Sequence, residues 1–221
     1  SPLDYAKDSS DYAIVPGVCV ASEGNGSIVV CFKEGIKRVS TLAADPAFAS
    51  EIILTKIILA EEFEIEPVIV PSAGPVEHML ERADAALLAG DAAFRQSNPS
   101  AGFIDIVEEW VEMTGLPYVH ALWCVHEHRM SPQVIEQVQA ACAKGVAGIS
   151  DIAFQFPKDE RRGVQEFLES FTYELLPNVQ DGLSEFMKYL YYHGVTPDVS
   201  DLNFYRKKSE ADSLPRSVSP N

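Results

Sequence analysis

Between residues 40 and 95, short apolar segments alternate with helix-forming segments, and this alternation constrains the fold more than any other feature of the chain. The predicted elements are, in order, a strand at 40–44, a helix at 50–63, a strand at 67–70, a helix at 76–82 and a strand at 85–89. Short connections between alternating strands and helices are typical of a parallel α/β sheet. The sequence therefore predicts an α/β fold built around such a sheet. It also predicts a turn at Pro16 and Gly17 between strands at 12–15 and 18–21, and a helix at 104–113 that stops at Gly115 in the left-handed conformation.

Two long apolar strands, at 27–32 and 118–125, bracket this block. The pattern is typical of a two-lobed protein in which such strands cross between the lobes and a ligand binds in the cleft. We expect one lobe to comprise residues 1–27 and 119–206 and the other to comprise residues 28–118. The first lobe should be helical after residue 126, with helices at 133–146, 164–173 and 182–192, and the polar tail at 207–221 should be disordered.

The strand at 85–89 ends at Gly90, and Asp91 follows where the N-cap of a short helix at 92–95 belongs. Ligands of open α/β sheets bind at the carboxyl ends of strands, where helix N-termini offer free N–H groups. A turn followed by a cap explains the same two residues without a ligand. Gly24, Asn25 and Gly26 form a second flexible turn, of the kind that lets the backbone approach a ligand.

Charge and composition exclude several classes of function. Acidic residues outnumber basic ones 33 to 17, for a net charge of −16, so a polyanion such as nucleic acid would be repelled. No apolar run approaches the roughly 20 residues that span a bilayer. The four cysteines show no metal-binding spacing, which predicts structural thiols and a reducing compartment.

The histidines do not form a metal site in the sequence. His126 and His128 are two residues apart at a strand end, without a third ligand in view. His120 lies in the apolar strand at 118–125, where it could act as an acid or base near neutral pH. A hydrogen-bonded core histidine is the commoner outcome on such a strand.

Several segments between Ser1 and about Tyr192 match one known pattern. They are Leu-Ala-Gly-Asp-Ala-Ala at 88–93, Glu-Glu-Trp at 108–110, Thr-Gly-Leu-Pro-Tyr-Val at 114–119 and Ala-Leu-Trp at 121–123, together with Phe167, Leu168, Tyr173, Gly182, Leu183, Phe186 and Gly194. On these segments the chain resembles the chorismate dehydratase family of the futalosine route to menaquinone. The resemblance implies a two-lobed fold of the type II periplasmic-binding-protein kind.

The resemblance also implies a function. Members of this family remove water from chorismate to give 3-[(1-carboxyvinyl)oxy]benzoate, and formation of the aromatic ring means that no cofactor or metal is needed. A small carboxylate substrate and a cytoplasmic location are expected. Ser27 matches the serine that the family places against the substrate, which implies a catalytic role. The expected substrate-binding residues are Ser1, Asn25, Ser50, Gly90, Asp91 and Tyr118.

The chain departs from the family pattern in two places. Family members carry a further segment before the position of Ser1, so the first lobe is expected to be incomplete. The family has a hydroxyl-rich run with an arginine at the start of the helix at 50–63, whereas here only Ser50 keeps a hydroxyl, beside Phe48 and Glu51. A non-catalytic carboxylate-binding protein of the same fold is therefore the alternative. The related dihydroxynaphthoate-forming enzyme is a third reading, but its motifs are absent.

Overall fold

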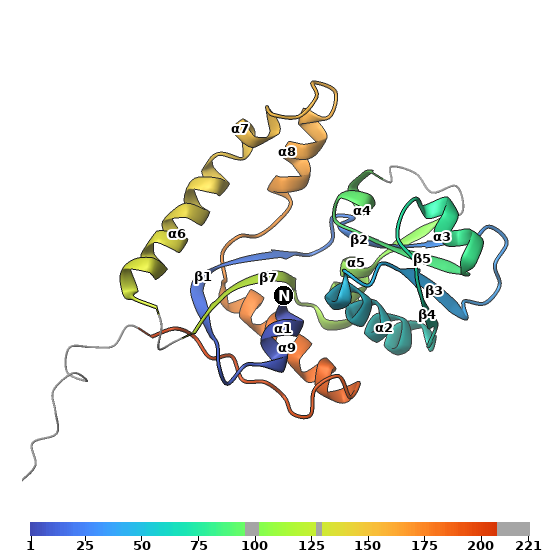
Figure 1. Ribbon diagram of the computed structural model, residues 1–221, viewed down its shortest axis with the longest axis horizontal. Coiled ribbons are helices and arrows are strands. Elements are labelled where there is room, and N and C mark those ends of the chain that lie inside the picture. The colour runs from blue at the N-terminus through green and yellow to red at the C-terminus, as the bar shows by residue number, and fades with distance from the viewer. Residues whose placement is uncertain (96–101, 127–129, 207–221) are drawn as a thin grey trace, which may run out of the picture.

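The computed structural model describes residues 1–95, 102–126 and 130–206, which contain two separate sheets (Figure 1). One sheet pairs β1 (Ala13–Ser22) with β7 (Tyr118–Val125) in antiparallel fashion. The other has five strands in the order β4-β3-β5-β2-β6. The two sheets are joined by the segment from Ser22 to Ile28 and by the turn before Tyr118.

The five-stranded sheet is mixed, not parallel throughout. Its strands are β2 (Ile28–Phe32), β3 (Thr41–Ala44), β4 (Val68–Pro71), β5 (Ala85–Ala89) and β6 (Phe103–Asp105). The predicted parallel arrangement is right for β3 with β4 and β5 but wrong for β2, which runs antiparallel to β5 and β6. The physical reason is the direction from which the chain enters: β2 begins at the edge of the sheet where β5 ends, with Ile28 opposite Ala89, so the two strands run in opposite directions.

Helices cover this sheet at the positions that the apolar spacing predicts. They are α2 (Ala49–Phe63), α3 (Val76–Arg82), α4 (Asp91–Arg95) and α5 (Ile106–Thr114). The sequence-based helix at 104–113 was wrong at its start, because Phe103 and Ile104 pair with β2 as a strand. Asp105 ends that strand and caps α5 by accepting from the N–H groups of Val107 and Glu108. Gly115 ends α5 in the left-handed conformation that was predicted.

The two-stranded sheet is covered by α1 (Pro2–Lys7) and α9 (Pro177–Tyr192) (Figure 1). The side chains of Trp110, Tyr118 and Phe186 are almost fully buried and meet edge to face, with ring centroids 5.4–6.0 Å apart. This aromatic cluster joins α5, β7 and α9. Pro16 and Gly17, predicted to be a turn between two strands, instead lie in an irregular stretch inside the single strand β1.

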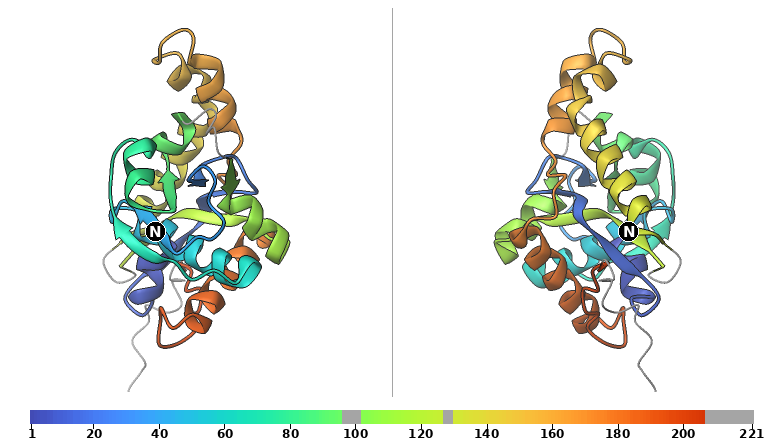
Figure 2. Two further views of the ribbon diagram at one scale, coloured as in Figure 1. Left: turned by 90° about the vertical axis from the view of Figure 1, so that its right-hand side faces the viewer. Right: turned by 90° about the vertical axis from the view of Figure 1, so that its left-hand side faces the viewer.

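Three further helices form an arm that projects from the rest of the molecule in both side views (Figure 2). They are α6 (Pro132–Ala147), α7 (Ile149–Ala153) and α8 (Arg161–Glu169). The prediction at 133–146 matches α6, whereas the one at 164–173 runs too far, because Thr172 leaves the helix to pair with Ala21 of β1. The arm accounts for part of the predicted helical C-terminal region.

The division into lobes at residues 27/28 and 118/119 remains a prediction. The tail predicted at 207–221 and the residue His128 lie outside the described residues. None of the helices in the described part of the chain is long and apolar enough to cross a membrane.

Candidate functional site

One edge of the five-stranded sheet gathers most of the residues that were predicted to bind a ligand. β3 and β5 are parallel and both end at this edge, and β2 begins there because it runs the opposite way. In the β2–β5 register Ile28 lies opposite Ala89, so Ser27 and Gly90 are neighbours, and the Gly90 N–H donates to the Ser27 carbonyl at 2.9 Å. Strand ends of this kind are where open α/β sheets bind ligands.

The Ser27 hydroxyl is buried and unpaired. The residue is only 5% exposed, and its Oγ atom has no hydrogen-bond partner among the described residues. Its backbone is held by Gly90 and by the Asn25 side chain, whose Oδ1 accepts from the Ser27 N–H at 3.2 Å. Buried polar groups in folded proteins are nearly always hydrogen-bonded, so this hydroxyl is a candidate contact for a ligand or a water.

A second unpaired hydroxyl lies at the start of α2. Ser50 is 5% exposed, and its Oγ has no hydrogen-bond partner in the described part of the chain. The residue at the N-cap position is Phe48, and none of the described side chains caps the first turn of this 15-residue helix. Uncapped N–H groups and the helix dipole favour an anion at this position.

Tyr118 of β7 lies beside Ser50 and links it to the two-stranded sheet. Burial raises the pKa of the Tyr118 phenol, whereas a polar interaction with the Ser50 hydroxyl, which lies outside hydrogen-bonding geometry, lowers it and the Glu51 carboxylate raises it. The phenol therefore stays protonated near neutral pH and can donate a hydrogen bond. Glu51 places a negative charge close to the same two hydroxyls, which opposes the binding of a carboxylate there.

The turn before Ser27 is held by a residue that the sequence analysis missed. Asp105 is 6% exposed, and its Oδ2 atom accepts from the N–H groups of Asn25 at 3.1 Å and Gly26 at 2.6 Å. The Asn25 amide in turn donates to the Ser170 hydroxyl at 3.0 Å. The spacing of Asp105 and Glu108 before an apolar run is a sequence signal for a helix N-terminus. The helix predicted at 104–113 instead includes Asp105 as an ordinary helical residue.

Asp91 does not cap α4. The helix begins at Asp91, and the Gly90 carbonyl accepts from the Phe94 N–H at 2.9 Å, so Gly90 stands at the position predicted for Asp91. The positive φ of Gly90, 59°, is a conformation that favours glycine and makes the strand turn sharply into the helix. Gly90 and Asp91 are both exposed at the edge that also holds Ser27.

Ser1 is not brought to this edge. It caps α1, where its hydroxyl and the Asp4 side chain form a capping box, and it lines a separate cavity of about 330 Å³ with Asp4, Tyr5 and Trp123. None of the other predicted binding residues lines that cavity.

A hydrogen-bonded pair at the end of β1 was also missed. The Ser22 hydroxyl lies 2.8 Å from Nε2 of His120, and Ser22 is 2% exposed. In the register of the two-stranded sheet Ser22 faces Tyr118, so the pair lies next to the Tyr118–Ser50 contact. The expectation that His120 is hydrogen-bonded is confirmed. No local pattern in the sequence identifies its partner, because the two residues are 98 positions apart.

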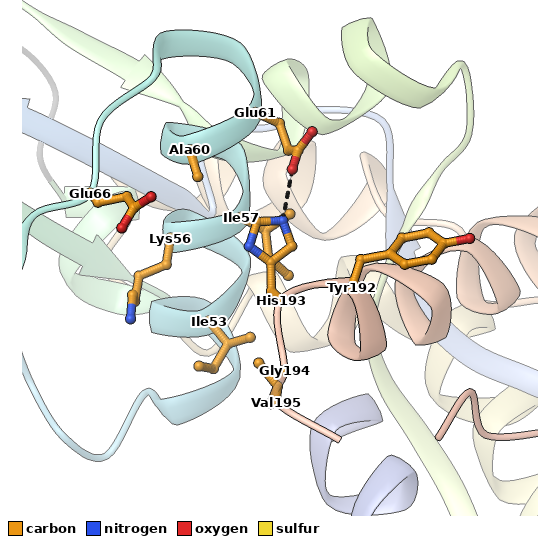
Figure 3. Close-up of a pocket in the computed structure, with 10 residues that line it drawn as sticks. All are labelled: Ile53, Lys56, Ile57, Ala60, Glu61, Glu66, Tyr192, His193, Gly194 and Val195. Atoms are coloured by element: carbon orange, nitrogen blue, oxygen red, sulfur yellow. Dashed lines mark hydrogen bonds and ion pairs between the residues drawn. The ribbon is translucent and has the colours of Figure 1, made fainter. Parts of the chain in front are cut away.

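A different cavity, of about 620 Å³, lies between α2 and the C-terminal end of α9 (Figure 3). Lys56 and Glu66 line it from the α2 side, and Nε2 of His193 lies 2.9 Å from the Glu61 carboxylate. It contains none of the residues predicted to bind the substrate. Within residues 1–95, 102–126 and 130–206, no cluster of three or more metal-ligating side chains exists.

Comparison with known proteins identifies one matching family and several solved structures of similar fold. A family model described as menaquinone biosynthesis matches residues 1–192. The crystal structure of protein AF1704 from Archaeoglobus fulgidus is similar with a TM-score of 0.63 and 20% identity, over 88% of this chain and 78% of that one.

Two transport proteins have a similar fold. An ABC transporter protein from Parabacteroides distasonis matches with a TM-score of 0.58 and 13% identity, over 94% of this chain and 79% of that one. The zinc-bound ligand-binding component of an ABC-type import system from Staphylococcus aureus matches with a TM-score of 0.57 and 11% identity, over 93% and 76%. At these identities the likeness concerns the fold alone, and it confirms the predicted α/β fold of the periplasmic-binding-protein kind.

Proposed function

Since this chain belongs to the menaquinone biosynthesis family, we propose that it is a chorismate dehydratase. In this proposal it eliminates water from chorismate to give 3-[(1-carboxyvinyl)oxy]benzoate, as a carbon–oxygen lyase without a cofactor. All four cysteines are free thiols, which supports a reducing, cytoplasmic compartment.

The observation that carries the proposal is the pair of unpaired buried hydroxyls. Ser27 and Ser50 are each 5% exposed without a hydrogen-bond partner in the described part of the chain. Leaving a buried hydroxyl unpaired costs about 1–3 kcal/mol, so two such groups, one at the start of β2 and one in the uncapped first turn of α2, suit a bound ligand rich in oxygen. Chorismate has two carboxylates and one leaving hydroxyl, which are the groups that such donors recognise.

These groups supply binding and orientation. The Ser50 hydroxyl and the free N–H groups of α2 would hold one carboxylate, with the Tyr118 phenol as a further donor. The Ser27 hydroxyl would donate to the other carboxylate or to the departing hydroxyl, where charge develops in the transition state. Because the product ring is aromatic, holding the substrate in the reactive geometry supplies much of the catalysis.

Glu51 favours the alternative, a protein of the same fold that binds a small carboxylate without converting it. Its carboxylate lies close enough to Tyr118 to raise the pKa of that phenol, so it also repels an anion at Ser50. The similarity in fold to components of ABC importers fits this alternative as well.

The deciding experiment adds chorismate to the purified full-length gene product and follows 3-[(1-carboxyvinyl)oxy]benzoate by chromatography. Turnover well above a reaction without enzyme supports the dehydratase. Binding of chorismate in a calorimeter without turnover supports the carboxylate-binding alternative, and neither binding nor turnover from a folded protein contradicts both.

Three variants test the site. Ser27→Ala and Ser50→Ala should each lower turnover at least about tenfold, with little loss of folding stability, because each removes a hydroxyl that has no hydrogen-bond partner among the described residues. Thr55→Val is the matched control. Thr55 lies on the same helix, is fully buried, and also has an unpaired hydroxyl, but it is more than one turn from the helix start. If Thr55→Val lowers turnover as much as Ser50→Ala, the assignment of Ser50 is wrong.

A further inference from the structure

The strand β7 contains one extra residue at His120. Opposite β1, Val119 pairs with Ala21, whereas Ala121 pairs with Val20, so two steps along β7 correspond to one step along β1. His120 is the unpaired residue of this β-bulge. Bulges redirect a side chain and occur often beside active sites.

The bulge directs His120 toward a single hydrogen bond. Its Nε2 atom lies 2.8 Å from the Ser22 hydroxyl, and the described residues give Nδ1 no hydrogen-bond partner. The imidazole packs edge to face against the rings of Tyr118 and Phe171, with centroids 5.0 and 5.4 Å apart. The side chain is therefore fixed in orientation, with one nitrogen bound to Ser22 and the other uncommitted.

The surroundings keep this histidine neutral. Burial lowers the pKa of His120 to about 4, so the imidazole carries no charge near neutral pH and can accept a proton. Tyr118 is the titratable neighbour on the same strand, and its phenol is protonated in that range. In the tautomer that carries its proton on Nε2, the Ser22 oxygen accepts and Nδ1 keeps a free lone pair, which is the form that general base catalysis uses.

A serine–histidine pair also occurs in hydrolases, but this pair does not suit that chemistry. Ser22 is 2% exposed, so its oxygen is poorly placed to attack a substrate. A hydrolase histidine is oriented by a third group on its other nitrogen, and the described residues supply none here. The geometry instead leaves Nδ1 of His120 as the reactive atom.

We propose that His120 is the base of the dehydration and that Ser22 is its positioning residue. This inference rests on the proposed function. Nδ1 takes the proton from the ring carbon next to the one that carries the hydroxyl, while Nε2–H donates to the Ser22 oxygen. The electrons of the broken C–H bond enter the new aromatic ring, and the C–O bond breaks. The proton on Nδ1 passes to the departing oxygen, so one water leaves and the imidazole becomes neutral again.

The position of His120 agrees with the candidate site. Tyr118 lies two residues before His120 on β7. Its ring contacts the His120 ring, and its phenol lies near the Ser50 hydroxyl. Ser22 is five residues before Ser27 on the segment that joins the two sheets. The pair therefore adds a neutral proton acceptor to a site that already holds the carboxylates of Glu51 and Asp91.

The test compares four variants of the full-length protein with chorismate as substrate. His120→Phe keeps an aromatic ring against Tyr118 and Phe171 and should lower kcat about a hundredfold or more, with KM changed only a few-fold. Ser22→Ala should cause a smaller loss of kcat. The double variant should be no less active than His120→Phe, because the two residues act as one unit.

His126→Phe is the matched control. His126 lies beyond the other end of β7, where its imidazole stacks on Tyr12, and the variant should keep wild-type turnover.

The double variant also separates catalysis from structure. His120→Phe leaves the buried Ser22 hydroxyl without a partner, whereas the double variant removes both polar groups and should recover much of the lost melting temperature. We expect the melting temperature of the double variant to recover while its turnover stays as low as that of His120→Phe. Recovery of turnover in the double variant, or an active His120→Phe, overturns the proposal while the dehydratase assignment stands. A wild-type protein that does not convert chorismate overturns both.

Discussion

The two sheets differ in regularity. In the five-stranded sheet, β2 pairs with β5 over five consecutive residue pairs without a shift, from Ile28–Ala89 to Phe32–Ala85. In the two-stranded sheet, the register of β1 and β7 shifts twice, once around Pro16 and Gly17 and once at His120. The strand ends of the regular sheet carry the candidate binding residues Ser27, Gly90 and Asp91. In the irregular sheet, the bulge at His120 redirects that side chain.

The two sheets also differ in what stabilises them. An isolated pair of strands is marginally stable in water, so the two-stranded sheet depends on helices packed against it, whereas the five-stranded sheet has a buried central strand, β5, with all five residues buried. Side chains in the irregular sheet should therefore be the more sensitive to substitution, and the predictions below test that difference.

The largest effect is expected at Gly182, where α9 meets the segment before β7. A Cβ atom at this position would run into the backbone carbonyl of Pro117, so the helix must move away from the sheet. We expect Gly182→Ala to lower the free energy of unfolding by about 3 kcal/mol, measured by urea denaturation.

Gly145→Ala is the control for that substitution. Gly145 is also inside a helix, but a Cβ atom there meets nothing within 4 Å, so the replacement should stabilise the protein by about 0.5–1 kcal/mol. Equal effects of the two substitutions would show that the contact of α9 with Pro117 does not support the two-stranded sheet.

A comparable effect is expected from pH at His120. Folding lowers the pKa of His120 from its ordinary value of 6.5 to about 4 through burial, so the unfolded chain binds the proton more readily. The stability that the neutral side chain contributes is complete above pH 6.5 and falls as the pH decreases to about 4. The total loss should be about 3 kcal/mol at 25 °C. The measurement is the difference in unfolding free energy between the wild type and His120→Phe at several pH values, because carboxylate titration is common to both. A difference that does not depend on pH would contradict the burial of His120.

The smallest effect is expected from two aspartates that bind backbone N–H groups. Asp105, at the junction of the sheets, is 6% exposed, and its Oδ2 accepts from Asn25 and Gly26. Asp105→Asn places an amide against these donors and should lower the free energy of unfolding by about 2 kcal/mol.

Asp84 accepts from the N–H groups of Ser40 and Thr41 in the same way, but it is half-buried. Asp84→Asn should therefore lower the free energy of unfolding by less than about 1 kcal/mol. Chemical denaturation of both variants checks the order, and a reversed order would mean that the junction is not the more sensitive region.

Local sequence patterns predicted most of the elements. The helix α3 and the strands β5 and β7 have the predicted bounds, because their apolar spacing and flanking residues are local signals. The prediction failed at Ile104, which continues the apolar pattern of α5 but pairs with β2 instead. It also failed in the direction of β2, because a buried strand has the same composition whichever way it runs.

The candidate site shows the same limit. The sequence and the family resemblance identified Ser27 and Ser50, which the structure presents as buried hydroxyls without hydrogen-bond partners in the described residues. The Asp91 cap was wrong by one residue, and Asp105 and Ser22 were missed.

The sequence by itself determined most of the strands and helices, which family the chain resembles, and which classes of ligand its charge disfavours. Those properties follow from composition and from periods of two to four residues, which each segment carries alone. Only the tertiary structure decided that His120 meets Ser22 and that Asp105 holds the turn at Asn25. These contacts join residues 98 and 80 positions apart. They depend on the register of paired strands, and a single bulge is enough to redirect a side chain within it.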